Sequence, residues 1–496
     1  MIKFNKNIIN KLSVIAIAAF LITSCSKPEQ SSTTGWDYNN PENGGFEVAP
    51  FEEQETGPGL VFIEGGTFIM GRTEQDVMYD WNNVPRKVTV RSFYMDETEV
   101  KNLDYQEYLY WLGRVYGTDY PEVVRKAQPD DNVWRDKLSF NEPLVENYFS
   151  HPAYRDYPVV GVTWLQATDY CAWRTNRVNE NILIQMGVLD MDPDQTNENN
   201  FNTDAYLAGQ YEGLVQEDLE DLNPSGAGTR KVNKRDGILL PNYRLPTEAE
   251  WEFAALGLIG NTMYERVIER RIYPWNGHIT RTDDKKAYGE MVANFKRGKG
   301  DYMGVAGNLN DGADITAPVY AYWPNDYGLY NMAGNVSEWV LDVYRPMSTE
   351  DMTDFNPFRG NVYKKKKVDS DGLIQEKDSL GRVVYEDVTV EENVTRRNYR
   401  KANNINYIDG DYSSVLNSGG DWLSEPEDKN TSKLMYEYGI ASMVNDETRV
   451  YKGGSWKDKA YFLSPGARRF MEQDQANDNI GFRCAMTRVG SPFQAR

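Results

Sequence analysis

Residues 328–339 read GLYNMAGNVSEW, a stretch in which two glycines and two asparagines precede a glutamate and a tryptophan. Short motifs of similar length lie on both sides of it. In chain order they are EGGTFIMG at 64–71, PVVGVTW at 158–164, RLPTEAEWE at 244–252, GGSW at 453–456 and IGFRC at 480–484. Each motif alone is a weak signal, but six in a fixed order are specific, and together they decide the fold.

The composition describes a folded and acidic chain. Aromatic residues make up 13% of the 496 residues, which favours a packed core because disordered chains are poor in them. The formal net charge is −21. A chain of this charge repels nucleic-acid phosphates, so we expect no nucleic-acid partner. Acidity also serves solubility, and most of these charges need no other explanation.

The N-terminus has the pattern of an export signal. Lys3, Lys6 and Lys11 precede an apolar run at 12–22 that is too short to span a bilayer. Residues 22–25 read ITSC, which resembles a bacterial lipobox, in which the chain is cut before the cysteine. On that interpretation residues 1–24 are a signal peptide and Cys25 carries the lipid anchor. No aspartate follows Cys25, which favours the outer membrane, on its periplasmic face. The alternative is an ordinary secretory signal with a chance cysteine.

The stretch after Cys25 predicts a lipidated tether. Residues 25–59 are polar and rich in glycine, proline and asparagine, which is typical of a flexible linker. Within it, GWDYN at 35–39 and GGF at 44–46 carry aromatic side chains. We keep two interpretations of these side chains open, packing on the domain surface and a short docking segment.

Local patterns beyond residue 60 predict strands and one helix. Apolar runs at 60–63 and 67–70 flank two glycines as in a β-hairpin. Two valines alternate with a polar residue at 88–90, as in a strand. Apolar side chains recur at helical spacing across 105–112, which predicts a helix.

Two further helices are predicted from their first turns. Thr163 and Gln166 have the spacing of a capping box, as do Thr247 and Glu250. The second of these helices should end near Gly257.

Two polar stretches, near 180–238 and 345–448, interrupt this order. Neither shows a sustained helical or strand period, so we interpret both as insertions in one domain that spans 60–488. A tail at 489–496 follows. The lysine run at 364–367 predicts a solvated loop, with a contact patch as the alternative.

The six motifs together resemble the formylglycine-generating enzyme (sulfatase-modifying factor) family over roughly residues 60–488. The resemblance implies an α+β fold with little regular secondary structure, related to C-type lectin-like folds. Enzymes of this family oxidise a substrate cysteine with two thiols that bind copper.

This chain lacks both of those thiols. The family positions, at fixed offsets after GGS, are Asp458 and Leu463 here. A carboxylate does not replace a soft thiolate that binds Cu(I), and leucine offers no ligand. The chain has two histidines, His151 and His278, and their spacing does not support a histidine-based iron site. We therefore expect no copper and no enzyme activity.

The other two cysteines take a structural role by the same resemblance. The family often joins the helix after GVTW to the GFRC strand by a disulfide, which implies a Cys171–Cys484 bond. An exported protein would keep such a bond. Closing a loop of about 300 residues stabilises by a few kcal/mol in the chain-entropy model. The alternative is two buried free thiols that behave as small apolar side chains.

Structural Ca²⁺ is a further implication of the resemblance. Ca²⁺ takes six to eight hard oxygen ligands, which side chains and backbone carbonyls supply. The residues that match the first family site are Asn331, Gly334, Val336 and Glu338. Those that match the second are Asn294, Phe295, Asp311 and Ala313. The alternative for the first set is a turn capped by its own asparagine and glutamate.

A narrower resemblance adds a cellular setting. The lipobox, the aromatic GWDYN segment and the thiol-less domain together resemble the gliding-motility lipoproteins of Bacteroidetes, the J type before the K type. This implies a non-catalytic scaffold whose partners are other subunits of the gliding motility and type IX secretion machinery.

Two other classes of function stay open. One is an enzyme of altered chemistry that uses Asp458, Arg468 or Arg469, and the other is a lectin-like or peptide-binding module with contacts from Trp456 and Arg483.

Overall fold

The computed structural model describes residues 29–72, 82–257, 271–275, 278–298, 311–344, 358–359, 364–389, 392, 410–411 and 447–490. Cys25 and the predicted signal lie outside them. The chain divides into two units, residues 1–52 with 217–238 and residues 53–216 with 239–496. None of the helices in the described ranges combines the length and the apolar character that crossing a bilayer requires.

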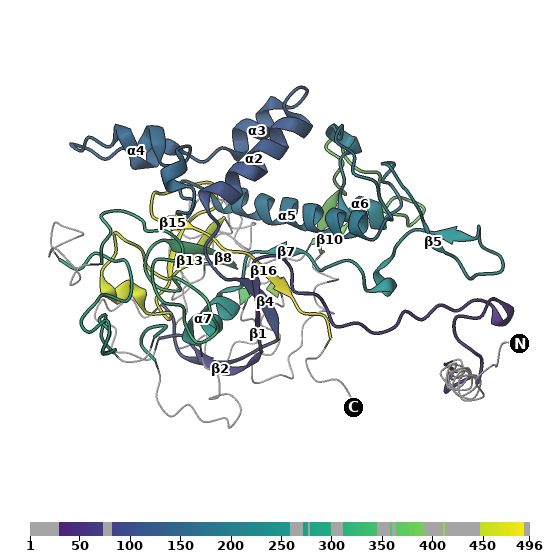
Figure 1. The fold of residues 1–496 in the computed structure, drawn as a ribbon, viewed down its shortest axis with the longest axis horizontal. Coiled ribbons are helices and arrows are strands. Elements are labelled where there is room, and N and C mark those ends of the chain that lie inside the picture. The colour runs from purple at the N-terminus through teal and green to yellow at the C-terminus, as the bar shows by residue number, and fades with distance from the viewer. Residues whose placement is uncertain are drawn as a thin grey trace, which may run out of the picture. The chain divides into compact units, whose positions relative to one another are not determined.

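Two four-stranded sheets organise the larger unit (Figure 1). The strands of the first, in spatial order, are β1 (Leu60–Ile63), β4 (Phe93–Asp96), β16 (Ala485–Thr487) and β7 (Tyr243–Arg244). Those of the second are β14 (Arg469–Glu472), β13 (Thr448–Lys452), β8 (Ser337–Val343) and β15 (Ile480–Gly481). In the first sheet the early strand β4 pairs with the late strand β16, so both ends of the domain are tied together.

The predicted hairpin between 60–63 and 67–70 is wrong. β1 pairs with β4, whereas β2 (Gly66–Met70) pairs with β3 (Arg86–Val90) in a separate two-stranded sheet. Gly65 is needed because the backbone of β3 passes very close to it, and not because it forms a turn between β1 and β2. A Cβ at Gly65 would lie 2.4 Å from the carbonyl oxygen of Val90. The strand expected at 88–90 is confirmed as part of β3.

The three predicted helices are confirmed, with their caps. They are α2 (Asn102–Tyr116), α5 (Trp164–Gln185) and α7 (Glu248–Leu256). Thr163 Oγ1 accepts from the Gln166 N–H at 3.1 Å, and Gln166 Oε1 accepts from the Thr163 N–H at 2.8 Å. The second box at Thr247 is also complete, and Gly257 ends α7 with a φ of 56°, a left-handed conformation that favours glycine. The shorter helices are α3 (Pro121–Ala127), α4 (Glu142–Asn147) and α6 (Thr203–Leu207).

Aromatic side chains fill the core between the helices and the sheets. Tyr105 of α2 stacks on Tyr170 of α5 with ring centroids 5.7 Å apart. Several buried indoles donate their N–H groups to backbone carbonyls, for example Trp339 to the Val162 carbonyl at 3.0 Å. Trp164 Nε1 donates to the Val340 carbonyl at 2.8 Å and so fixes the start of α5 against β8.

The two insertions pack on each other within the larger unit. Asn200 Nδ2 donates to the Leu380 carbonyl at 2.8 Å, and Lys366 pairs with Asp204 at 2.6 Å. The lysine run is therefore not a solvated loop. It forms β10 (Lys364–Lys366), which pairs with β11 (Tyr385–Asp387). A short parallel pair, β9 (Phe358–Arg359) with β12 (Gly410–Asp411), is also present.

The smaller unit joins the predicted tether to part of the first insertion, an association that the sequence did not predict. Its strands are β5 (Leu219–Glu220) and β6 (Thr229–Arg230). Arg230 Nε donates to Glu47 Oε2 at 2.6 Å, and the same guanidinium pairs with Asp236. A Cβ at Gly45 would lie 1.8 Å from the Leu222 carbonyl oxygen, so glycine is required there. The aromatic side chains Trp36 and Phe46 remain exposed.

Candidate functional site

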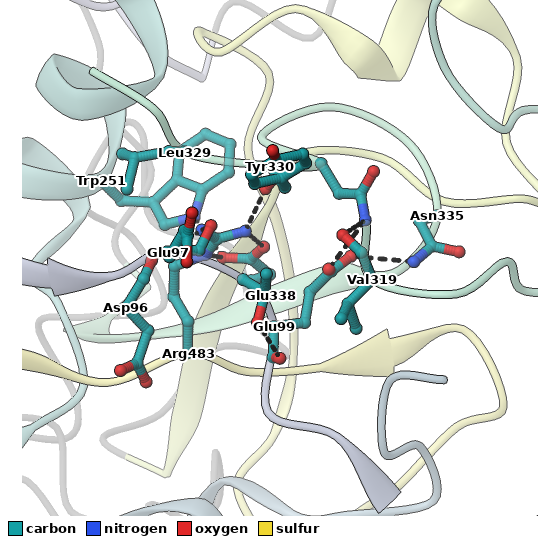
Figure 2. A network of polar contacts seen from close by, with 12 residues as sticks. Asp96, Glu97, Glu99, Trp251, Val319, Leu329, Tyr330, Asn335, Glu338 and Arg483 are labelled. Carbon is teal, nitrogen blue, oxygen red and sulfur yellow. Dashed lines mark hydrogen bonds and ion pairs between the residues drawn. The ribbon is translucent and has the colours of Figure 1, made fainter. Parts of the chain in front are cut away.

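A buried ion pair joins β8 to the segment that follows β15 in the larger unit (Figure 2). Arg483 donates to both carboxylate oxygens of Glu338 at 2.6 Å, and both side chains are 0% exposed. Trp251 Nε1 donates to the same carboxylate at 2.7 Å. The remaining Arg483 donors reach the carbonyls of Asp96 at 3.1 Å and Tyr330 at 2.8 Å. A buried pair persists only when its remaining groups are hydrogen-bonded in this way.

A second buried carboxyl, Glu99, lies beside this pair. It accepts from Asn331 Nδ2 at 2.9 Å and from Asn335 Nδ2 at 3.0 Å. Both asparagines have left-handed backbone, with φ of 52° and 62°, which asparagine tolerates better than most residues. Burial is the main reason that the pKa of Glu99 is raised to about 8. The positive charge of Arg483 lowers this pKa, and the negative charge of Glu338 raises it.

The residues of the first predicted Ca²⁺ site form this same network. Glu338 is the one carboxylate among the four, and Arg483 already compensates its charge. The Asn331 amide donates to Glu99, and a Cβ at Gly334 would lie 2.4 Å from the Asn294 carbonyl oxygen. This arrangement suits a close-packed structural turn, and it fits Ca²⁺ poorly because no uncompensated carboxylate is offered.

The residues of the second predicted Ca²⁺ site fit a hard cation better. The structure brings them together, since Asp311 accepts from the backbone N–H of Ala313 at 3.4 Å and from that of Phe295. Burial raises the pKa of Asp311 to about 6, so its negative charge is unfavourable there and a cation would stabilise it. No group of three or more His, Cys, Asp or Glu side chains is arranged for a metal in the described part of the chain. A site here would therefore depend on backbone and amide oxygens as well.

The two positions at which the resemblance places thiols hold an aspartate in an ion pair and a buried leucine. Asp458 accepts from Arg469 at 2.6 Å and 2.7 Å, and Ser455 Oγ also donates to it. Arg469 donates further to Ser337 Oγ at 2.7 Å. Leu463 is 0% exposed in an apolar cluster. The other buried members of that cluster are Met291, Ala293, Phe295 and Ala333.

Cys171 and Cys484 meet as the resemblance implied. Their Sγ atoms lie 3.2 Å apart, both side chains are buried, and the structure has them as free thiols. Burial and the neighbouring Cys171 raise the pKa of the Cys484 thiol, which disfavours the thiolate form. The disulfide bond itself stays a prediction.

A second buried charge cluster was missed by the sequence analysis. Lys452 Nζ is 3.3 Å from Glu248 and 3.1 Å from Glu252, and Arg468 Nε is 2.7 Å from Glu248. Although burial alone would raise the pKa of Glu248, the cations Arg468 and Lys452 hold it at about 2. Arg468 is therefore part of the framework and not of an open cleft. The RLPTEAEWE motif contains both glutamates of this cluster, but its sequence does not show which of its acidic side chains are buried.

The residues considered as contacts of a peptide or glycan are also structural. Trp456 is buried and stacks on Trp134 with centroids 6.0 Å apart. Arg483 is committed to Glu338. Neither side chain is available to a ligand in this structure.

Fold and site together define an α+β domain whose motif residues build a buried polar framework. Residues 45–488 match the sulfatase-modifying factor enzyme 1-like domain, and the chain belongs to this family. The α+β fold class predicted from the motifs is confirmed.

Relatives of this chain include an enzyme and a protein named as inactive. It is 28% identical over 316 residues to the formylglycine-generating enzyme of Mus musculus, a match that covers 63% of this chain and 65% of the enzyme. It is 24% identical over 307 residues to inactive C-alpha-formylglycine-generating enzyme 2 of the same species, covering 58% of this chain and 70% of that protein. The chain thus spans somewhat less than two thirds of the mouse enzyme and 57% of its Bos taurus counterpart.

Among solved structures, PvdO from Pseudomonas aeruginosa matches with a TM-score of 0.37 at 14% identity, covering 86% of this chain and 94% of that one. Treponema denticola variable protein 1 matches with a TM-score of 0.36 at 15% identity and the same coverage.

Proposed function

We propose that this protein is a non-catalytic member of its family, a lipid-anchored scaffold of the outer membrane. The observation that carries the proposal is the pair of residues at the thiol positions. Asp458 is bound by Arg469, and Leu463 is buried among apolar side chains. Neither residue supplies the soft sulfur ligand that Cu(I) prefers. The Leu463 side chain also occupies the volume in which a second thiol would lie.

The proposed partners are other subunits of the gliding motility and type IX secretion machinery. Support comes from the resemblance of the lipobox, the GWDYN segment and the thiol-less domain to the gliding-motility lipoproteins, the J type first. Trp36 of that segment and Phe46 of the nearby GGF motif are exposed, as a contact with another subunit requires.

Crosslinking in living cells tests the scaffold proposal. The full chain, tagged at its C-terminus, is crosslinked in the envelope and recovered, with a tagged unrelated lipoprotein as the control. Enrichment of motility or secretion subunits with this chain alone is expected. A deletion strain that glides and secretes normally contradicts the proposed role.

The lipid anchor is tested separately at Cys25. Metabolic labelling with an alkyne fatty acid should mark the wild-type chain and not Cys25→Ser, which should move to the soluble fraction. Two acyl chains bind a membrane far more firmly than one. Unchanged membrane association of Cys25→Ser, without label on either chain, contradicts the anchor.

Ca²⁺ is the proposed structural ion, and copper has no proposed role. A ligand that binds only the folded state raises the melting temperature, so chelation with EGTA should lower it by a few degrees. Asp311→Asn should abolish that response, whereas Asp283→Asn, at an exposed acid nearby in sequence, should retain it. A melting temperature that does not change with EGTA removes the calcium proposal.

A further inference from the structure

Two large apolar side chains stand in solvent on the loop that leads into α4, a helix at the upper left edge of the larger unit in Figure 1. Leu138 is 109% exposed and Phe140 is 82% exposed. Single exposed apolar residues are ordinary on a protein surface, but two on one short loop form a candidate contact site. Residues 136–140 are called the tip below.

The backbone of the tip is strained at Leu138. Its φ of 67° lies in the left-handed region, which a leucine rarely adopts because its Cβ crowds the backbone. The other non-glycine residues with positive φ in the described part of the chain are all asparagines, namely Asn39, Asn197, Asn331 and Asn335. An asparagine at 138 would relieve the strain, so the leucine is not explained by the stability of the loop. Strain of this kind is typical of binding sites.

Side-chain bonds hold the tip in one shape. Arg135 donates to both carboxylate oxygens of Glu142, at 2.9 Å and 3.0 Å, and so closes the loop at its base. The Asn141 amide donates to the carbonyl of Trp134 at 2.9 Å, and Trp134 is buried. A tip fixed in this way loses little conformational entropy on binding, which favours a partner with a matching cavity. Binding to a bilayer would depend on apolar area and cationic charge, and the tip offers little of either.

The smaller unit contains a groove of suitable size. Its volume is about 580 Å³, and it lies between the segment 39–49 and β5 with the residues that follow β5. Such a volume accommodates two apolar side chains. The apolar residues of its lining are Phe46, Val48, Ala49, Leu219 and Leu222. Phe46 is 60% exposed, so the groove presents apolar surface to solvent.

The charges of the tip and the groove are complementary. The groove lining contains four carboxylates and two cations. Arg230 pairs with two of the carboxylates, whereas Glu220 and Asp221 form no ion pair among the residues that the structure describes. On the tip, the exposed Lys137 adjoins Leu138 and likewise forms no ion pair within the described ranges. A tip seated in the groove would bring Lys137 close to these two carboxylates.

We propose that the tip of one copy of this chain inserts Leu138 and Phe140 into the groove of a second copy. The contact joins two different surfaces, so each copy in such a pair still offers one tip or one groove to a further copy. The proposal does not depend on the lipid anchor or on the proposed partner subunits. It adds a contact between copies of the chain itself.

Sedimentation velocity on the full chain tests the self-association. Cys25→Ser is used throughout, in mild detergent, so that no attached lipid drives the association. The mean mass should rise with concentration. Leu138→Asn should weaken the association about tenfold or more, without lowering the melting temperature, because asparagine tolerates the left-handed backbone. Leu373→Asn, at an exposed leucine outside the tip, is the matched control and should associate as the parent chain does. A parent chain that stays monomeric, or equal weakening by both variants, overturns the proposal.

Mixing two variants tests the pairing of tip with groove. Phe46→Ser, in the groove, should also fail to associate alone. A mixture of Phe46→Ser with Leu138→Asn should form dimers of one copy each and nothing larger, because only one intact tip and one intact groove remain between them. A mixture that stays monomeric overturns the proposal. Binding of the parent chain to phosphatidylcholine vesicles through Leu138, without self-association, would show a membrane contact and would overturn it as well.

Discussion

Two arginine–carboxylate pairs, each with one member on the second four-stranded sheet, differ in burial and in their place in the motifs. Arg483 and Glu338 belong to two of the six motifs, are both 0% exposed, and join β8 to the C-terminal segment. Arg469 and Asp458 are 19% and 12% exposed, and Asp458 stands at a thiol position. The first pair belongs to the buried framework, whereas the second lies where the resemblance to the family places a thiol.

The largest expected effect comes from breaking the first pair. Arg483→Met leaves Glu338 buried without its cation, which should lower the free energy of unfolding by about 3–5 kcal/mol. Urea denaturation measures the loss. The double variant Arg483→Met with Glu338→Leu should recover part of it, because no charge is then buried alone. A loss below about 1 kcal/mol for the single variant would contradict the framework role.

The leucine at the second thiol position should have the next largest effect. Leu463→Ala removes buried apolar atoms and leaves a cavity, which should cost about 2–4 kcal/mol. Leu373→Ala, at an exposed leucine, is the matched control and should change stability by less than about 0.5 kcal/mol. Equal effects in urea denaturation would show that Leu463 does not fill the former site.

A smaller loss is expected from the second ion pair. Asp458→Asn weakens the bonds from Arg469 and should cost about 1–2 kcal/mol, since the pair is partly exposed. Glu142→Gln, in the exposed pair with Arg135, should cost clearly less, because solvent and salt screen that pair. If both substitutions cost the same, the pair at the thiol position is an ordinary surface contact.

The pH dependence of stability should show the smallest effect. The pKa of Glu99 is raised from 4.5 to about 8, so between these values the folded chain holds a proton that the unfolded chain has lost. Stability should therefore fall as the pH rises from 5 to 8, by about 1 kcal/mol.

The contribution of Glu99 is isolated by measuring how the free energy of unfolding changes with pH in the wild type and in a Glu99→Gln variant, and taking the difference. Asp342, whose pKa burial raises to about 7, contributes in the same direction and remains in both proteins. Glu248 contributes only at lower pH, because its stabilisation is lost as the pH falls from 4.5 toward 2. Identical pH slopes for the two proteins would show that Glu99 does not titrate as its surroundings require.

Much of the fold could be predicted because its signals are local or ordered along the chain. A capping box such as Thr163 to Gln166 spans one helical turn, and motif order identifies the family. Pairing between distant segments could not be predicted in this way. β1 pairs with β4, about 30 residues later, although the nearer β2 looked like its partner. Lys452 pairs with Glu248, which lies 204 residues earlier in the chain, and no local pattern shows that either charge is buried.

The central claim is that the residues at the thiol positions exclude the family's oxidation chemistry, and one measurement tests it directly. The purified full chain is incubated with copper, oxygen and a cysteine-containing peptide, and the peptide is analysed by mass spectrometry with an aldehyde-reactive probe. An active formylglycine-generating enzyme serves as the positive control. The account predicts an unmodified peptide thiol at every time point. Formation of formylglycine by this chain above the copper-only background would contradict it.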